Sequence, residues 1–431
     1  MADTADPPGC SLREAVAALA SPTVGTASNG CVRNVLVGRG PDVIRFSSTI
    51  IPGQIILNSL ISTDRDYTLQ GPGRDLLELN GLGQTGLLRA QGELTVADVT
   101  LRNGNDIGAG AVSASVLNLI NARIINSQSE SGTGGAAAMT AYVENTEFIG
   151  NSSLTPDGGA LRVEDLTMID SFFENNTGGD ATILVTSAAT ISGTMFHANA
   201  GGNYGAIHAL GANVAVSDSA FIDNGGQATS TLAVSDQPNR VGRGTIRQSY
   251  ISNDGSLGAA NYALSVDGDG SELIIENTTV SGVRGISNWS DGKLELVDST
   301  VYLEGVATAP ALNLTNRSVT RVERSIVFST DGPDCIDGGT QFTENRNNIY
   351  GDGDCTANQD GVIFADPFLG ALQDNGGDTL SRLPGTGSPA IDAGGIFCAA
   401  VDQRGFNRVG LCDIGAIEAG ANDALFANGF E

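Results

Sequence analysis

The sequence predicts an all-β solenoid, a parallel β-helix, on three observations. An apolar anchor recurs about every 25 residues, and a small hydroxyl residue stands two positions before each anchor. An asparagine follows each anchor by three positions. Between the anchors lie short runs of β-favouring residues broken by Gly, Asn and Asp, with no room for a helix of ordinary length. The anchors are Phe148, Phe173, Phe196 and Phe221, and the asparagines are Asn151, Asn176, Asn199 and Asn224.

Stacked coils would place each of these residue types in a column, with strands about 4.8 Å apart. We expect the phenylalanines to stack in the core and the asparagines to form a ladder at a sharp corner, because Asn tolerates left-handed backbone and bonds to neighbouring backbone. The alternative, that Asn only marks loops, stays open at this point. Weaker matches extend the anchor register through Leu101, Ile124, Ile251, Val280, Val301 and Ile326, and the hydroxyl column through Ser249, Thr278 and Ser299.

Composition restricts the partners. The chain has 431 residues, with 22 Lys and Arg against 49 Asp and Glu, for a net charge of -27. Lys293 is the only lysine. A surface with this much negative charge repels nucleic acid phosphates and anionic lipid headgroups. We therefore expect no nucleic acid partner. No apolar run approaches the length of a membrane span, so we expect no transmembrane segment. One elongated, monomeric solenoid with covered ends is the predicted organisation.

The six cysteines fall in pairs that are local in sequence and lie outside the repeats. They lack the CxxC spacing of a zinc site, and the chain has only two histidines, so we predict disulfides near the two ends and an oxidising compartment. The predicted pairs are Cys10 with Cys31, Cys335 with Cys355, and Cys398 with Cys412.

A short helix is predicted at the amino end. Ser11 and Glu14 have the spacing of a capping box, and Leu12, Ala15, Val16 and Leu19 form one apolar face. We expect this helix, with the apolar segment 42–46 after it, to act as a lid over the first coil.

Motifs at both ends resemble known modules. Cys10-Ser-Leu-Arg-Glu-Ala15 resembles the CSLREA domain that opens many secreted bacterial β-helix proteins, and the segments 42–46 and 67–73 resemble the first coils that follow it. Six motifs near the carboxyl end together resemble the choice-of-anchor Q domain. They are Asn348-Ile-Tyr-Gly351, Asp366-Pro-Phe-Leu-Gly370, Asp374-Asn-Gly-Gly377, Gly387-Ser-Pro-Ala-Ile-Asp-Ala-Gly394, Asp402-Gln-Arg-Gly405 and Cys412-Asp-Ile-Gly-Ala-Ile-Glu418.

This resemblance implies a right-handed, pectate-lyase-like parallel β-helix that is secreted or surface-exposed, in a family with no general catalytic assignment. It divides the chain into a cap at 1–45, β-helix repeats at 46–330, a choice-of-anchor Q-like module at 331–420 and a tail at 421–431. The tail is similar to short Gly-Phe-Glu tails on exported proteins of gram-negative bacteria, which implies that origin. An ordinary disordered terminus is the alternative.

An outward column after the asparagine corner is the place to look for catalysis. Arg162 and His208 are expected two coils apart, with Glu164 among the nearby carboxylates, as in a polysaccharide lyase or glycoside hydrolase. The motif sets of polygalacturonases and of calcium-dependent lyases are missing, so we expect His208 and His197 to be exposed surface residues instead. The remaining members of the column are Leu184, Ala233, Ser265, Ser287, Asn313 and Asp337.

Acidic turns are candidates for a calcium site, the one cofactor that the sequence raises. Their spacing can wrap calcium, although no EF-hand loop is complete and solvated turns explain them equally well. The candidate ligands are Asp331, Asp334, Asp337, Asp352 and Asp354.

A long repetitive surface without a complete active site favours a non-catalytic role. We expect a secreted or cell-surface scaffold for adhesion or glycan binding, with extracellular polysaccharide or a host surface as its partner. A polysaccharide lyase or hydrolase and a passive stalk without a ligand remain the alternatives.

Overall fold

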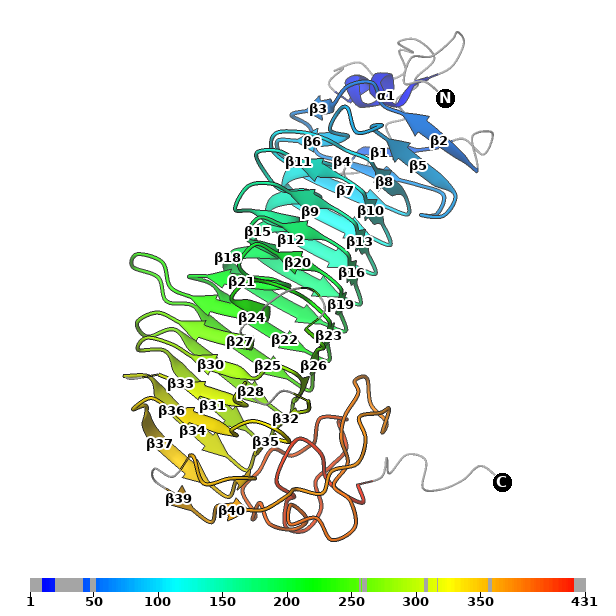
Figure 1. Cartoon of the computed structure of the whole chain (residues 1–431). Helices are drawn as coiled ribbons and strands as arrows, with labels where there is room; N and C mark the ends of the chain where they lie inside the picture. The colour runs from blue at the N-terminus through cyan, green and yellow to red at the C-terminus, as the bar shows by residue number, and fades with distance from the viewer. Residues whose placement is uncertain are drawn as a thin grey trace, which may run out of the picture. The chain divides into compact units, whose positions relative to one another are not determined.

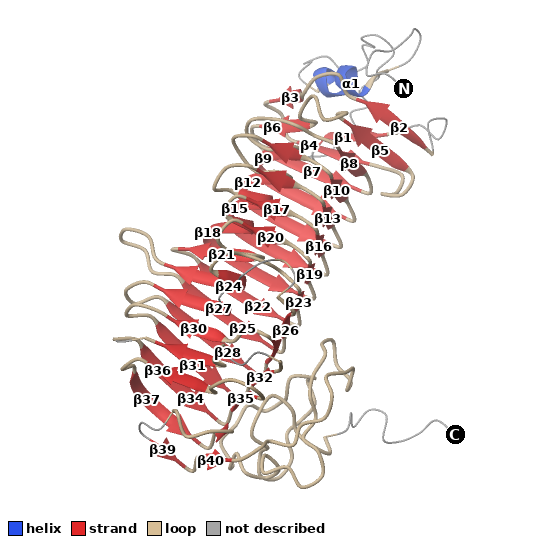
Figure 2. Cartoon of the chain, viewed as in Figure 1, coloured by secondary structure: helices blue, strands red, loops and turns tan. Residues whose placement is uncertain are grey.

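The computed structural model describes residues 10–19, 42–46, 52–255, 257, 262–305, 309–315, 317–355 and 359–421. It confirms the predicted all-β fold, a solenoid of parallel strands with about 12 turns and a single short helix in the part described (Figures 1 and 2). The chain divides into two compact units. Unit 1 comprises Met1–Val185 and Asn199–Gly202, and unit 2 comprises Thr186–Ala198 and Asn203–Glu431.

The predicted helix is α1 (Leu12–Ala18), which opens unit 1. Its capping box is present, because the Ser11 hydroxyl accepts from the Glu14 N–H and the Glu14 carboxylate accepts from the Ser11 N–H. Leu12 and Val16 are buried, and α1 contacts β3 (Ile61–Thr63). Cys10 is disulfide-bonded, and its predicted partner Cys31 lies outside the described residues.

The strands of unit 1 form three parallel sheets. The first contains β1 (Asp42–Arg45), β3, β4 (Tyr67–Gln70), β6 (Leu88–Ala90), β7 (Glu93–Ala97), β9 (Val112–Ile120), β12 (Ala136–Glu144) and β15 (Gly158–Ile169). The second contains β2 (Gly53–Ile56), β5 (Leu77–Asn80), β8 (Thr100–Arg102), β10 (Arg123–Ile125), β13 (Glu147–Ile149) and β16 (Phe172–Glu174). The third contains β11 (Gln128–Ser129), β14 (Ser152–Ser153), β17 (Thr177–Gly178) and β20 (Ala200–Gly201).

The pairing of β1 confirms that 42–46 belongs to the first coils and corrects the prediction that it acts as a lid. Asp42 to Arg45 pair in register with Tyr67 to Gln70, so this segment is itself a coil of the solenoid. The reason is its alternating burial, which is that of a strand with one face on a core.

β18 (Ala181–Ser192) runs from unit 1 into unit 2, where the strands again form parallel sheets. The first sheet contains β21 (Ile207–Leu210), β22 (Asn213–Ser217), β24 (Thr229–Ser235), β25 (Arg243–Arg247), β27 (Tyr262–Asp267), β28 (Glu272–Glu276), β30 (Ile286–Asn288), β31 (Lys293–Val297), β33 (Leu312–Leu314), β34 (Val319–Glu323), β36 (Cys335–Asp337), β37 (Gln341–Arg346) and β39 (Gln359–Asp360). The second contains β19 (Met195–His197), β23 (Ala220–Ile222), β26 (Tyr250–Asn253), β29 (Thr279–Gly282), β32 (Thr300–Leu303), β35 (Ile326–Ser329), β38 (Ile349–Tyr350) and β40 (Ile363–Phe364). Paired strands therefore continue well past residue 330.

The phenylalanine stacks lie in the core, as predicted. The Phe148 and Phe173 ring centroids are 4.6 Å apart in unit 1, and those of Phe196 and Phe221 are 4.7 Å apart in unit 2. All four side chains are fully buried. The extended register holds from Leu101 to Ile124 to Phe148, and from Phe221 through Ile251 and Val280 to Val301.

The last member of that register was predicted wrongly, because Val301 pairs with Val327 and not with Ile326. Ile326 points to the other face of β35, where it packs in a second buried cluster with Ile349, Ala390 and Ile414. Both faces of this strand are buried, so apolar character could not identify the inward residue.

The asparagine ladder is confirmed, with one correction. Asn151 N–H and Nδ2 donate to Asn176 Oδ1 at 3.0 and 2.9 Å, and Asn176 Nδ2 donates to Asn199 Oδ1 at 2.8 Å. Asn176 Nδ2 also donates to the Phe148 carbonyl at 2.8 Å. The left-handed residue at each corner is the one before the ladder asparagine, so the ladder side chain is free to satisfy buried backbone groups. These left-handed residues are Gly150, Asn175, Ala198 and Asp223.

The hydroxyl column forms a second ladder at another corner. In unit 1 the Thr146 N–H donates to Ser171 Oγ at 3.2 Å, while the Ser171 hydroxyl donates to the Ile169 carbonyl. The same backbone-to-hydroxyl bond repeats from coil to coil in unit 2. Its members there are Thr194, Ser219, Ser249, Thr278, Ser299 and Ser325.

A loop-rich C-terminal segment, residues 365–421, packs along the second sheet of unit 2, beside β32 and β35 (Figure 1). Thr279 Oγ1 donates to Gln403 Oε1 at 2.6 Å, and the Ala416 N–H donates to Thr300 Oγ1 at 3.1 Å. The segment therefore covers the outward hydroxyls of this sheet.

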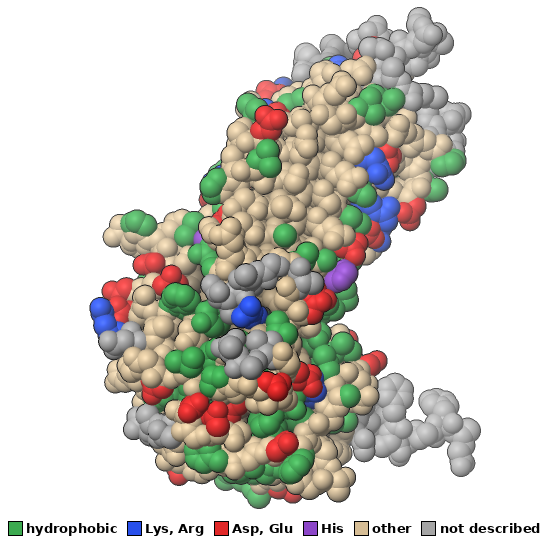
Figure 3. Space-filling model, in the orientation of Figure 1, with side chains coloured by type: hydrophobic (Ala, Val, Ile, Leu, Met, Phe, Trp, Pro, Cys, Tyr) green, Lys and Arg blue, Asp and Glu red, His purple; other side chains and the backbone are tan. Residues whose placement is uncertain are grey.

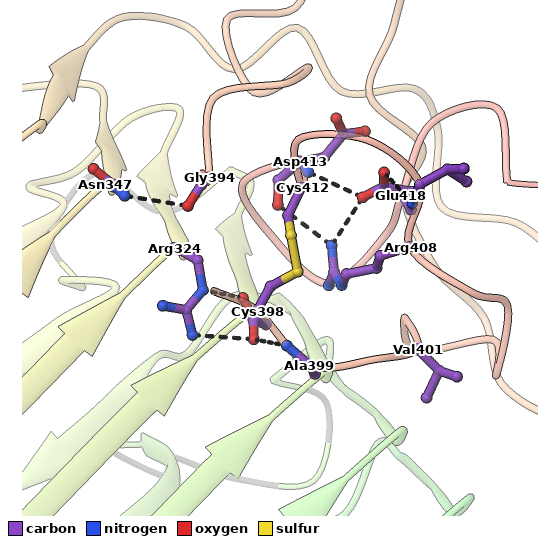
Figure 4. Close-up of a disulfide and its surroundings, with 12 residues drawn as sticks. Arg324, Asn347, Gly394, Cys398, Ala399, Val401, Arg408, Cys412, Asp413 and Glu418 are labelled. Carbon is purple, nitrogen blue, oxygen red and sulfur yellow. Dashed lines mark hydrogen bonds and ion pairs between the residues drawn. A yellow bond between two sulfur atoms is a disulfide. The ribbon is translucent and has the colours of Figure 1, made fainter. Parts of the chain in front are cut away.

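The predicted pairs Cys335–Cys355 and Cys398–Cys412 are both disulfides. Figure 4 shows that Cys398–Cys412 lies where the C-terminal segment meets a corner of the solenoid. There the Ala399 N–H donates to Asp298 Oδ2 at 3.1 Å, and Asp298 also pairs with Arg324 at 2.7 Å. The disulfide thus joins two loops that the solenoid holds through buried polar groups.

Candidate functional site

The predicted catalytic group is divided between the two units. Arg162 and Glu164 lie on β15 in unit 1, both exposed, and Arg162 Nη1 pairs with Asp157 Oδ2 at 3.2 Å. His208 lies on β21 in unit 2. Neither unit by itself holds all three residues as one site.

His208 is buried, with an exposed fraction of 5%, so the prediction of an exposed surface histidine is wrong. Its Nε2 lies 2.8 Å from Ser235 Oγ, and its ring centroid is 4.2 Å from that of Tyr204. Neighbouring segments place Ser235 and Tyr204 against His208. The position of His208 in the outward column does not predict this burial. His197, after the Phe196 anchor, is half-buried.

The outward column is otherwise confirmed within unit 2, where it runs from His208 through Ala233, Ser265 and Ser287 to Asn313. Its last predicted member is wrong by one residue, because Asn313 pairs with Ile336 and Asp337 pairs with Leu314. Coil lengths vary here, so counting residues does not fix the register.

A small hollow opens on this column, across β24, β27 and the end of β30. Its volume is about 90 Å³. The lining residues are Tyr204, Ala228, Thr229, Ala233, Val234, Ser235, Ser265, Asp267 and Trp289. They combine aromatic, hydroxyl and carboxylate groups, and we refer to this site as the Trp289 hollow.

Trp289 supplies an aromatic surface to the hollow. It is the only tryptophan of the chain, and its exposed fraction is 39%. Its ring meets that of Tyr262 edge to face at 5.9 Å, and the Tyr262 hydroxyl accepts from Asn313 Nδ2 at 2.7 Å. Burial raises the pKa of Tyr262 above its ordinary value. Because Tyr262 is anchored in this way, the indole is held in place while part of it faces solvent.

Hydroxyl groups form the polar part of the hollow. Thr229 Oγ1 and Ser265 Oγ lie 2.6 Å apart, and both residues are buried. Ser235 Oγ contacts His208 as described above. Hydroxyls both donate and accept, so these groups suit a ligand that itself carries hydroxyls.

One carboxylate, Asp267, lines the hollow, and a second, Asp236, lies close to it outside the lining. Both flank Gly268, whose φ of 108° favours glycine and whose Cα approaches the Asp236 carboxylate so closely that a Cβ would collide with it. Partial burial raises the pKa of Asp267, and the charge of Asp236 adds to the rise, against a hydrogen bond from the Gly268 N–H. No ion pair of either carboxylate is found among the residues that the structure describes.

Four of the five candidate calcium ligands, Asp331, Asp334, Asp337 and Asp352, accept hydrogen bonds from backbone N–H groups of their own or neighbouring turns. Asp334, almost fully buried, accepts N–H bonds from Ser329, Gly351 and Asp352. Asp337 Oδ1 accepts from the Gly339 and Thr340 N–H groups, Asp331 Oδ2 from the Gly305 N–H, and Asp352 Oδ1 from the Asp354 N–H.

No group of three or more His, Cys, Asp or Glu side chains in the described ranges is arranged to hold a metal ion. Calcium binding stays a prediction. Burial raises the pKa of Asp334 to about 6, against the opposing effect of its three N–H bonds.

No family model matches this chain, and no curated protein matches it. None of the helices that the structure describes is long and apolar enough to cross a membrane. On the face in view in Figure 3, acidic side chains recur and basic ones occupy a few places beside them.

Sequence reasoning missed that Tyr204, Asp267 and Trp289 belong to one site. A single tryptophan in a chain with 5% aromatic residues was the available signal, together with the acidic turn that begins at Asp267. The sequence did not give the strand register, which aligns Tyr204 with Thr229 and places the backbone of Trp289 beside Val266.

Proposed function

We propose that this chain is a secreted or cell-surface β-helix scaffold that binds polysaccharide at the Trp289 hollow. The observation that carries the proposal is a partly exposed indole, held rigid beside a floor of hydroxyl groups. The apolar face of a sugar ring packs on an aromatic side chain, and its hydroxyls pair with protein hydroxyls and carboxylates.

The size of the hollow supports a polymer as the ligand. Pockets that enclose a small molecule usually measure about 300–1,000 Å³, and this one is about 90 Å³. It therefore suits one sugar residue of a chain that lies along the surface of the sheet. A solenoid offers such a chain an extended surface of stacked strands.

The disulfides and the sequence motifs both support an extracellular location. Disulfides persist in oxidising compartments, and the described residues contain Cys335–Cys355 and Cys398–Cys412. The CSLREA-like motif at Cys10 and the choice-of-anchor Q-like motifs after residue 347 support a secreted or surface-exposed bacterial protein. Adhesion to extracellular polysaccharide or to a host surface is the role that we propose there.

A second candidate function is glycoside hydrolysis. Asp267 has a raised pKa and lies beside Asp236, and glycosidases use one protonated and one ionised carboxyl group in this manner. This pair takes the place of Arg162, Glu164 and His208 as the catalytic candidate.

Affinity electrophoresis through gels containing neutral, acidic and amino polysaccharides tests the proposal. We expect at least one polysaccharide to retard the wild-type chain, and Trp289→Ala to abolish that retardation. Phe397→Ala is the matched control, because Phe397 is an aromatic residue with an exposed fraction of 80% outside the hollow. Wild-type mobility that no polysaccharide changes would overturn the proposal and favour a passive stalk.

A reducing-end assay on the same polysaccharides separates binding from hydrolysis. New reducing ends that Asp267→Asn abolishes would establish the second candidate. Retardation without new ends would leave the scaffold function alone.

A further inference from the structure

We infer that the Trp289 hollow selects amino sugars, so that its ligand is a polysaccharide carrying protonated amines. This inference rests on the proposed glycan-binding function and specifies its substrate class. It is carried by the charge at the rim and by the position of the indole relative to that charge.

Two exposed carboxylates carry negative charge at the hollow, Asp267 in its lining and Asp236 next to Asp267. Asp236 and Asp267 lie on either side of Gly268, and neither takes part in an ion pair in the described part of the chain. The lining of the hollow includes no lysine or arginine. An ammonium group of a ligand is the complement that such a pair of carboxylates lacks.

The turn is built to keep the two carboxylates together. Only glycine fits at position 268, because its φ is positive and a side chain there would meet the Asp236 carboxylate. The Gly268 N–H also bonds to Asp267. Repulsion between the two carboxylates is therefore maintained by the fold, and a cation relieves it.

The indole lies next to this charge. Trp289 and Asp267 both line the hollow, and the backbone N–H of Trp289 donates to the carbonyl of Val266, the residue before Asp267, at 2.9 Å. A sugar ring that packs on the indole is thus adjacent to the carboxylates. A cation near the indole face gains further attraction from the ring.

The charge of the whole chain acts in the same direction. A net charge of -27 repels uronate polymers and attracts cationic ones. Neutral sugars gain only the aromatic and hydroxyl contacts. The order of affinity we expect is amino sugar, then neutral or N-acetylated sugar, then uronate.

Calorimetry with oligosaccharides of equal length tests this order. Glucosamine, N-acetylglucosamine and galacturonate oligomers would be titrated into the full chain at mildly acidic pH. We expect the glucosamine oligomer to bind at least about tenfold more tightly than its N-acetylated counterpart. Equal or weaker binding of the glucosamine oligomer would overturn the inference, while binding of the N-acetylated oligomer would leave the proposed function intact.

Matched variants locate the effect. Asp236→Asn and Asp267→Asn should each reduce the preference for glucosamine several-fold, without weakening binding of the N-acetylated oligomer. Asp269→Asn removes the same charge from an exposed position on the same turn and should preserve the preference. An equal loss in all three variants would show an effect of net charge and overturn the site.

A lysine oligomer serves as a final probe. Its binding should be weak and should not need Trp289. Binding of this peptide that depends on Asp236 and Asp267, with no binding of any sugar, would overturn both the inference and the proposed function.

Discussion

The second sheet carries different outward residues in the two units. In unit 1 they include the charged residues Arg123 and Glu147. Arg123 Nη1 pairs with Asp75 and Arg74 Nη2 pairs with Glu147, both at 2.9 Å, on a partly exposed surface. In unit 2 the outward residues Thr279 and Thr300 are buried under the C-terminal segment.

This difference shows that the outward residues of a solenoid determine which of its flanks is exposed to solvent. Inward columns look alike in both units, because stacked coils need the same apolar and ladder residues. Outward columns differ because charged side chains stay partly hydrated, while hydroxyls and short aliphatic residues accept a covering segment. The polar groups of the covered flank are satisfied by Gln403, Arg408 and the backbone at 415–416.

The largest effect should come from Arg408→Ala in the covered flank of unit 2. The side chain of Arg408 has an exposed fraction of 2%, pairs with Glu418 at 3.4 Å and donates to Asn277 Oδ1 at 3.0 Å. Removing it leaves Glu418 buried without its cation, so we expect about 3–5 kcal/mol of destabilisation. Urea unfolding would measure the loss, and limited proteolysis should cut first within 365–421. Unchanged proteolysis would contradict the assigned role of the segment.

Asn176→Ala tests the ladder that both units share. The substitution removes the acceptor for two bonds from Asn151 and the donor to the Phe148 carbonyl, all of them buried. We expect a loss of about 3 kcal/mol in the free energy of unfolding. Asn118→Ala is the control, because Asn118 bonds across strands on a partly exposed face and should cost under about 1 kcal/mol. Equal losses in the two variants would mean that the ladder has no special role.

Asp334 provides a test of a buried carboxylate without an arginine. Its folded pKa of about 6 lies above the ordinary value of 3.8, so the folded chain binds this proton more tightly than the unfolded chain. Stability contributed by Asp334 should therefore fall by about 2–3 kcal/mol as the pH rises from about 4 to about 6. Asp334→Asn should lack this slope, and the difference between wild type and variant across that pH range measures it. Parallel curves would contradict the shifted pKa.

The smallest effect should come from Arg123→Ala on the exposed flank of unit 1. Its guanidinium is about one quarter exposed and pairs with Glu147 and Asp75 at a hydrated surface. Such pairs contribute at most about 1 kcal/mol. Urea unfolding in low and high salt should show a small loss that salt reduces further. A loss as large as that of Arg408→Ala would erase the contrast between the flanks.

Sequence reasoning was most successful where identical residues repeat. The stacks of Phe148 and Phe196, the ladder through Asn176 and the capping box at Ser11 all depend on local spacing, which is visible in one sequence. It failed where burial depends on remote residues. His208 is buried against Tyr204 and Ser235, and Ile326 is buried against Ala390 and Ile414.

By itself, then, the sequence determined the parallel solenoid, its core columns and the disulfide pairs Cys335–Cys355 and Cys398–Cys412, because each follows from the period or from neighbours in the chain. Only the tertiary structure decided which flank of unit 2 is covered and that Tyr204, Asp267 and Trp289 share one hollow. The physical reason is that coils differ in length. A register set by backbone pairing brings together outward side chains that no periodic count aligns.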